Sequence, residues 1–189
     1  MAEMRPSPTA PQPQRPQISV IGSASGPDAL MALSRSLGRA IVDRGWRIVC
    51  GGLGGVMHAV AQGARSSERA TGSDVIGVLP SLDPNTANDC IDIVIPTGMQ
   101  HARNVLVVAS GGVVVALGGG AGTLSELALA WQFDKPIIAL AGSEGWAAEL
   151  AGRTLDPRRT DAIYAAQSVA EAIDEIERCL ARRSPTPAA

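Results

Sequence analysis

Residues 113–126 read VVVALGGGAGTLSE, and this stretch decides the fold. It opens with an apolar run typical of a buried strand in a parallel sheet. Glycines at 118, 119, 120 and 122 follow, and glycine lets the backbone approach a ligand closely. A helix is expected to begin at Thr123, with Thr123 as its cap. Because the first turn of a helix offers unpaired N–H groups and a positive dipole end, the stretch predicts a phosphate site.

Composition restricts the classes of protein to which the chain can belong. Its 189 residues suit one domain, and with 46% hydrophobic but only 3% aromatic residues the core must be aliphatic. The net charge is −2 with no basic stripe, which argues against nucleic acid as a partner. No apolar run reaches the roughly 18 residues of a membrane helix, so we expect no membrane partner. The N-terminus also lacks a secretory apolar segment.

Three cysteines indicate the cellular compartment. Cys50, Cys90 and Cys179 form no CxxC motif, and no histidine cluster accompanies them in the sequence. They are therefore interpreted as free thiols of a reducing compartment, with the cytoplasm as the default. We expect neither a disulfide framework nor a zinc site, and no metal or cofactor.

Strands and helices alternate along the chain. Strands are predicted at 18–21, 46–50, 75–79, 91–95, 113–117, 136–140 and 162–166, and helices from 27 or 28 to Gly45, from 56 to 64, and over 99–110, 123–133, 142–150 and 169–180. This order implies an α/β fold, a Rossmann-like doubly wound parallel sheet with helices on both faces, in a single domain over residues 17–182. The Pro- and Gln-rich residues 1–16 are predicted to be a disordered tail, and residues 183–189 a flexible one.

Glycine turns follow the first, second and fifth strands, at residues 22–26, 51–55 and 118–122. In a parallel sheet these turns meet at the carboxyl edge, where ligands bind. The third turn has no lysine, so it is not a GxxxxGK[ST] loop, and the first lacks the GxGxxG fingerprint of dinucleotide sites. A mononucleotide or another small phosphorylated molecule remains as the expected ligand.

Two motifs resemble a known family. GGLGGVM at 51–57 and GGGAGTLSE at 118–126 are similar to the paired motifs of the LONELY GUY (LOG) superfamily, long labelled possible lysine decarboxylases. Characterised members are phosphoribohydrolases, which remove ribose 5-phosphate from nucleoside 5′-monophosphates. PTGMQHARN at 96–104 looks closer to the bacterial branch with molybdenum cofactor carrier proteins, which bind a phosphorylated pterin without known turnover. The resemblance covers residues 18–180 and implies a homodimer or higher homo-oligomer, with helices 99–110 and 123–133 near the interface.

The resemblance also implies a catalytic pair. Arg103 and Glu126 match the Arg and Glu of the phosphoribohydrolases, whereas Asn104 stands where those enzymes usually carry Lys. Glu126 would stabilise positive charge on the ribose or orient water, and Arg103 would hold the phosphate or ribose. The expected ligand contacts are Gly22, Ser23, Gly52, Gly54, Gly55, Met57, Gly98, Met99, Asn104, Gly119, Gly120, Ala121, Gly122 and Thr123.

Simpler structural roles compete with these functional ones. Thr123-x-x-Glu126 is also a capping box, which by itself explains the glutamate. The histidines, His58 and His101, are interpreted as surface or helix-packing residues, and the Met57 and Met99 side chains as core.

Three functional hypotheses follow. The first is hydrolysis of the N-glycosidic bond of a nucleoside 5′-monophosphate. The second is a non-catalytic carrier for molybdenum cofactor or another phosphorylated ligand. The third is a sensor whose ligand shifts its assembly.

Overall fold

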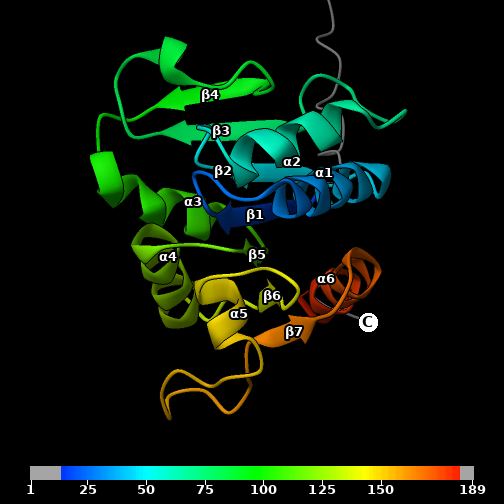
Figure 1. Ribbon diagram of the computed structural model, residues 1–189, viewed down its shortest axis with the longest axis vertical. Helices are drawn as coiled ribbons and strands as arrows, with labels where there is room; N and C mark the ends of the chain where they lie inside the picture. Colours follow the sequence, from blue (N-terminus) through cyan, green and yellow to red (C-terminus); the bar gives the residue numbers. More distant parts are fainter. Residues whose placement is uncertain (1–13, 184–189) are drawn as a thin grey trace, which may run out of the picture.

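The fold is organised on a seven-stranded sheet whose strands are all parallel, in the order β4-β3-β2-β1-β5-β6-β7 (Figure 1). The computed structural model describes residues 14–183. The strands are β1 Gln17–Gly22, β2 Arg47–Cys50, β3 Val75–Leu79, β4 Ile93–Pro96, β5 Val113–Leu117, β6 Ile137–Leu140 and β7 Tyr164–Ala166. The predicted doubly wound α/β fold is therefore confirmed.

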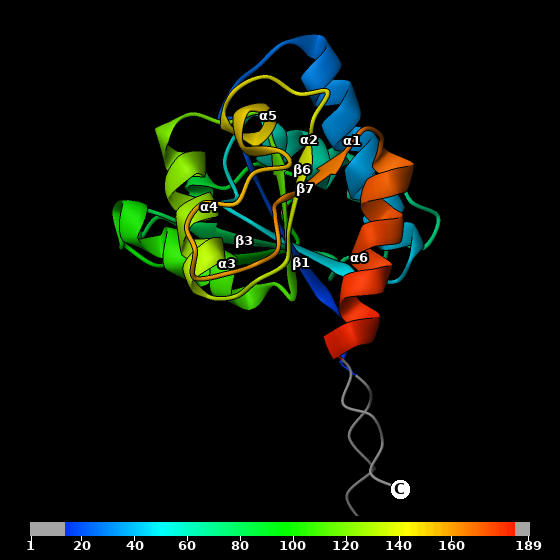
Figure 2. The ribbon, with the colours of Figure 1, turned by 90° about the horizontal axis from the view of Figure 1, so that it is seen from below.

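Helices cover both faces of the sheet. They are α1 Asp28–Asp43, α2 Val56–Arg65, α3 Asn104–Ser110, α4 Ala121–Gln132, α5 Trp146–Leu150 and α6 Val169–Arg183, with short 3₁₀ helices η1 Pro84–Thr86 and η2 Gln100–Arg103. In Figure 2, α1 and α6 lie on one side of the strands, and α3 and α4 lie on the other. None of the helices within residues 14–183 combines the length and apolarity needed to cross a bilayer.

Aliphatic side chains form a separate core on each face. One cluster joins α1, α2 and α6 to the sheet, and the other joins α3, α4 and α5 to it. All five residues of β5 are buried, as expected for a strand covered on both faces. Trp131 on α4 is also buried.

The chain reverses its winding direction beside β1. This strand pairs with β2 on one side and with β5 on the other, from Ile18↔Val113 to Gly22↔Leu117. Parallel sheets open a crevice outside the carboxyl ends of their strands at such a reversal. The glycine turns after β1, β2 and β5 therefore meet in one place.

The region before α3 differs from the prediction. A single helix was expected over 99–110, but Gly98 has a φ of 67° and Gln100 a φ of 49°, so the regular helix begins only at Asn104. This later start changes which side faces the sheet: the buried residues of α3 are Asn104, Val107 and Val108. Leu106, Ala109 and Ser110 are exposed, and so is Met99, so the prediction that Met99 is core is wrong.

The neighbouring strand and both chain ends also depart from expectation. The fourth strand was expected over 91–95, but it runs from Ile93 to Pro96 and lies at the edge of the sheet, partly exposed. Most of the predicted N-terminal tail lies outside the described residues. Within the described part, Arg15 donates a hydrogen bond of 2.5 Å to Asp74, so the packed structure includes Arg15. The C-terminal tail lies outside them except for Arg183, which belongs to α6.

Candidate functional site

A pocket of about 290 Å³ opens at the crevice beside β1. Its wall contains backbone or side-chain atoms from all three glycine turns and from the segments carrying Arg103 and Glu126. The lining residues are Val20, Ile21, Gly22, Ser23, Ala24, Gly51, Leu53, Met57, His101, Arg103, Asn104, Gly120, Gly122, Thr123 and Glu126. Nine of the sixteen predicted site residues are in this set.

Arg103 and Glu126 lie together in the pocket wall although 23 residues separate them in sequence. Nη1 of Arg103 donates to Oε1 of Glu126 at 3.3 Å, and the side chains are only 11% and 9% exposed. Nε of Arg103 is buried and has no hydrogen-bond partner among the described residues. The guanidinium therefore keeps donor capacity beyond its bond to Glu126.

Glu126 lies in an environment that favours its neutral form. Burial raises the pKa of Glu126 to about 7, although the nearby Arg103 acts in the opposite direction. A carboxyl group with this pKa can release or accept a proton near neutral pH.

The capping-box interpretation is wrong. The N-cap of α4 is Gly120, and no side chain caps it. Thr123 is the third residue of the helix, not its cap, and the carboxylate of Glu126 bonds to Arg103. Helix capping therefore does not explain Glu126.

The N-terminus of α4 borders the pocket. Gly120, Gly122 and Thr123 line it, and the first intrahelical bond shown at this end runs from Leu124 N–H to the Gly120 carbonyl. The first N–H groups of a helix have no partner inside it, and together with the dipole they attract an anion. A phosphate is the expected occupant of this end of the pocket.

The two earlier glycines of the same turn have a structural role. The N–H of Gly118 donates to Ser143 Oγ at 2.9 Å, and that of Gly119 donates to Ser23 Oγ at 2.6 Å. Gly119 does not line the pocket, and its φ of 108° suits only glycine. Backbone donors for a ligand therefore begin at Gly120.

Gly51 is a site residue that the sequence did not single out. A Cβ there would lie 2.5 Å from Nη2 of Arg103 and 2.7 Å from Sδ of Met57. The bare backbone thus makes room for the guanidinium beside β2. The residue lies at the start of the recognised GGLGG turn, but only packing distinguishes it from the other glycines there.

The other predicted glycines of this turn face away from the pocket. Gly52 has a φ of 72°, and its carbonyl accepts from Asn88. A Cβ on Gly55 would lie 2.3 Å from the Ser23 carbonyl oxygen, so this glycine packs the second turn against the first. Gly54 is exposed.

Three more predicted residues lie outside the pocket lining. Gly98 packs beside Leu82, Met99 is 44% exposed, and Ala121 is exposed at the start of α4. His101 is exposed, as its interpretation as a surface residue expected, and it also lines the pocket. The strand and turn residues Val20, Ile21, Ala24 and Leu53 also line it without having been predicted.

Asn104 lies in the pocket wall next to Arg103. It is buried, and its Nδ2 donates to Ser125 Oγ at 3.0 Å. The pocket thus has a neutral amide at the position where the phosphoribohydrolases usually carry a Lys.

Comparison with known proteins assigns the chain to a family. The model of the SLOG cluster4 family matches residues 15–173. The cytokinin riboside 5′-monophosphate phosphoribohydrolase of Mycobacterium tuberculosis is 34% identical over 131 residues, which cover 64% of this chain and 68% of the relative.

Two solved structures are similar over nearly their whole length. The molybdenum cofactor binding protein of Rippkaea orientalis has a TM-score of 0.77 at 34% identity, with 88% of this chain and 98% of that chain covered. The molybdenum cofactor carrier protein of Chlamydomonas reinhardtii has a TM-score of 0.74 at 33% identity, with 88% and 99% covered. The chain therefore belongs to the SLOG cluster4 family, on the branch of the LOG superfamily that resembles molybdenum cofactor carriers.

Proposed function

We propose that this protein binds a nucleoside 5′-monophosphate and hydrolyses its N-glycosidic bond. The observation that supports this most is the buried Arg103–Glu126 pair in the wall of a pocket that also borders an uncapped helix N-terminus. The relationship to a phosphoribohydrolase of M. tuberculosis supports the same reaction class.

The phosphate would bind at the N-terminus of α4. Backbone N–H groups of the first turn would donate to its oxygens, and the helix dipole would favour its charge. At about 290 Å³ the pocket lies at the small end of ligand sites, which suits one nucleotide better than a dinucleotide. The phosphate would thereby hold the ribose in a fixed position next to Glu126.

The reaction would break the bond between C1′ and the base nitrogen while a water oxygen bonds to C1′. Positive charge develops on the ribose ring in the transition state, and an ionised Glu126 beside it would be stabilising. Glu126 would accept one proton of the attacking water, and the same proton would leave with the base nitrogen. The products are ribose 5-phosphate and the free base. Because its pKa is about 7, Glu126 can take both protonation states near neutral pH.

Arg103 would act on the substrate and on Glu126 together. Its bond to Glu126 fixes the carboxylate, and its remaining N–H groups can donate to ribose or phosphate oxygens. Gly51 would keep the guanidinium in place.

A base-release assay tests this proposal. Purified protein is incubated with AMP, GMP, CMP and UMP, and free base is measured by chromatography. Turnover of at least one nucleotide is expected, with a loss of at least about 100-fold in Glu126→Gln and Arg103→Ala. Matched controls are Glu175→Gln, an equally buried carboxylate on α6, and Arg159→Ala, whose side chain is also 11% exposed. Absence of base release from all four nucleotides would refute the hydrolase proposal.

A carrier role is the second candidate. It is favoured by the likeness to two molybdenum cofactor proteins over nearly the full length of each, and by the neutral Asn104 beside Arg103. In that case a phosphorylated pterin would copurify and raise the melting temperature, with no base released. Since Glu126 would have no chemistry to perform, Glu126→Gln would keep its ligand affinity.

We also propose that the protein works as a homodimer in the cytoplasm. Val105 and Leu106 on α3 are each 38% exposed, as is Phe133 just after α4. These apolar side chains lie on the two segments expected near the interface from the LOG resemblance. The cytoplasmic assignment is supported by three cysteines that are all free.

A further inference from the structure

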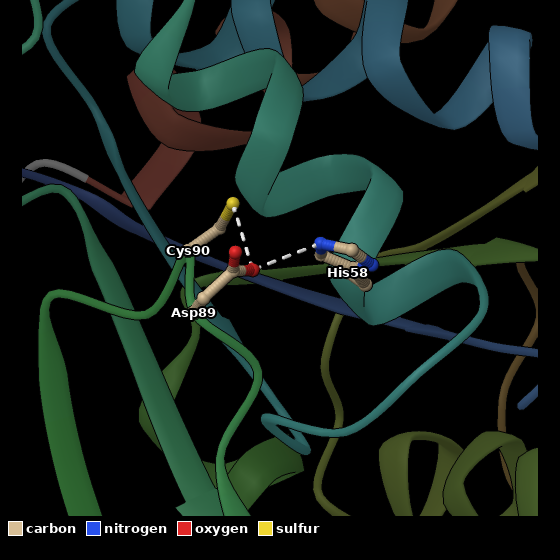
Figure 3. A group of neighbouring side chains, drawn as sticks. All are labelled: His58, Asp89 and Cys90. Carbon is tan, nitrogen blue, oxygen red and sulfur yellow. Dashed lines mark hydrogen bonds and ion pairs between the residues drawn. The ribbon is translucent and has the colours of Figure 1, made fainter.

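Outside the pocket, three potential metal-binding side chains meet beside α2 (Figure 3). His58 lies in the first turn of this helix, whereas Asp89 and Cys90 belong to the loop between η1 and β4. Oδ1 of Asp89 is 3.2 Å from Nε2 of His58 and 3.5 Å from Sγ of Cys90. The three candidate ligand atoms all lie within 4.8 Å of one another. Their separation in sequence, 32 residues from His58 to Cys90, explains why no metal motif was visible there.

The ring nitrogen of His58 that faces this group is buried without a hydrogen bond to the part of the chain that the structure describes. Nε2 is shielded from solvent, and it makes no hydrogen bond to any described residue, although Asp89 is close enough to count as an ion pair. Figure 3 shows this nitrogen turned toward Asp89 and the other one turned away. A buried ring nitrogen without a hydrogen bond is costly unless something else binds it.

The spacing of the atoms fits a tetrahedral metal ion. With zinc–sulfur bonds near 2.3 Å and zinc–nitrogen or zinc–oxygen bonds near 2.0–2.1 Å, tetrahedral ligands lie about 3.3–3.6 Å apart. Two of the three pairs already have such distances, 3.2 Å and 3.5 Å. The third pair, His58 and Cys90, lies within 4.8 Å and is the one that would need to approach further.

The loop that carries two of the ligands is already fixed in position. Nδ2 of Asn88 donates to the carbonyls of Gly52 and Leu53 at 3.1 Å and 2.7 Å, and its Oδ1 accepts from the N–H of Cys90 at 3.0 Å. Asn88 thus holds the loop against the turn from which α2 begins. A site built on fixed segments loses little entropy when an ion binds.

The chemistry of the group suits a divalent metal ion. Such an ion binds a cysteine as its thiolate and releases the thiol proton to solvent. Thiolate, imidazole and carboxylate together are the ligands that suit zinc.

We propose that His58, Asp89 and Cys90 form a zinc site with three protein ligands and a fourth position open to solvent. Asp89 is 86% exposed, so the open coordination position would face solvent next to Asp89. The ion would bind the η1–β4 loop to α2, behind the part of the pocket wall that contains Leu53. This proposal is independent of the proposed hydrolase or carrier function.

Cobalt titration tests the site. Protein stripped with a chelator is titrated with Co²⁺, which takes the place of zinc and gives a thiolate-to-metal charge-transfer band in the near ultraviolet. One equivalent is expected to saturate the band, and one equivalent of Zn²⁺ is expected to abolish it. His58→Ala and Cys90→Ser should each weaken Co²⁺ binding by more than about 100-fold, because even residues that only support metal ligands contribute 10–100-fold.

The matched control is Cys179→Ser, another buried cysteine, on α6 and outside the group. It should keep both the band and the stoichiometry. Circular dichroism of each variant checks that the fold is intact, and Asp89→Asn changes an exposed ligand whose substitution should leave the fold unchanged. The proposal is refuted if wild-type protein gives no saturable band. It is also refuted if the band survives Cys90→Ser or is lost in Cys179→Ser.

Discussion

At the scale of single residues, Glu126 has the clearest physical consequence. It is a carboxyl group whose pKa of about 7 lies well above its ordinary value of 4.5, because burial outweighs the attraction of Arg103. The folded protein therefore retains a proton on Glu126 at pH values where the unfolded chain has released it. The same property makes Glu126 suited to proton transfer and makes it a source of pH-dependent stability.

The sign of this pH dependence follows from linkage. The contribution of Glu126 to the free energy of unfolding is greatest below pH 4.5 and is lost as the pH rises through about 7. The full loss should be about 3 kcal/mol, because the pKa rises from 4.5 to about 7 and each pKa unit corresponds to about 1.36 kcal/mol. Urea unfolding at pH 5 and pH 8 should show this decrease in wild type and not in Glu126→Gln. Glu175→Gln should follow wild type, and equal pH slopes for wild type and Glu126→Gln would contradict the prediction.

Gly51 gives a second prediction at this scale. In Gly51→Ala the new methyl group would lie 2.5 Å from the Arg103 guanidinium, which must then move. We expect AMP affinity to fall about 10- to 100-fold, equivalent to roughly 1–3 kcal/mol for one charged contact. The fold should survive, since the atoms displaced are ends of flexible side chains. Gly54→Ala is the control within the same turn, because its nearest neighbour would be 3.5 Å away. Equal affinity of the two variants in calorimetry would contradict the role given to Gly51.

At the scale of secondary-structure elements, α1 and α2 pack unusually closely. A Cβ on Gly63 would lie 1.9 Å from the Arg35 carbonyl oxygen, and one on Gly38 would lie 2.0 Å from that of Val60. Each glycine therefore faces the backbone of the other helix. The contact fixes α2, which contributes Met57 to the pocket wall and carries His58 on the same turn.

Gly63→Ala should separate these helices. Alanine stabilises a helix relative to glycine by about 1 kcal/mol. The new methyl group of Gly63→Ala would, however, clash with the backbone of α1 at Arg35, and backbone cannot move aside as a side chain can. Overpacking of this kind costs about 1–3 kcal/mol or more, so we expect net destabilisation of roughly 2 kcal/mol in chemical unfolding. Gly142→Ala, where nothing lies within 4 Å, should leave stability within about 0.5 kcal/mol of wild type. A Gly63→Ala variant as stable as wild type would show that the helices do not constrain each other.

Most elements could be predicted from sequence because their patterns are local. The bounds of β3 match the prediction, and α6 forms where a helix was predicted over 169–180, with Ile173 and Ile176 buried at helical spacing. The start of α4 could not be predicted in the same way, because Thr123 is a good cap by propensity while the turn actually ends at Gly120. The break before α3 depends on the backbone of Gly98 and Gln100, which residue type alone does not determine.

The site was predictable to the level of the sheet edge and not beyond it. A parallel sheet brings its glycine turns together at one edge, which the sequence pattern predicts. That Arg103 and Glu126 act there as a pair was implied only by the LOG resemblance. Which glycine faces the ligand depends on tertiary packing: Gly51 borders the pocket, whereas Gly119 uses its N–H for Ser23. The proximity of His58 to Cys90 is likewise a long-range contact without a sequence pattern.

At the scale of the whole molecule, the exposed apolar residues of α3 and its surroundings predict self-association. Leu106→Asp would place a charge in the proposed dimer interface and should produce monomers, because burying an unpaired charge is costly. Sedimentation of the wild type should give twice the chain mass of 19.4 kDa. Ala32→Asp, on the exposed side of α1, should remain dimeric. A monomeric wild type at micromolar concentration would contradict the dimer.

The hydrogen bond from Gly119 to Ser23 has a consequence for motion. It connects the turn after β5 to the turn after β1, and these adjacent strands join the two halves of the sheet. A fluctuation that separates these two turns must break this bond, so amide hydrogen exchange in the two turns should be correlated. A ligand that contacts both turns would slow exchange in both together. A ligand held by α4 alone would slow it only beyond Gly119, so exchange measured by mass spectrometry can reveal how an occupant binds before its identity is known.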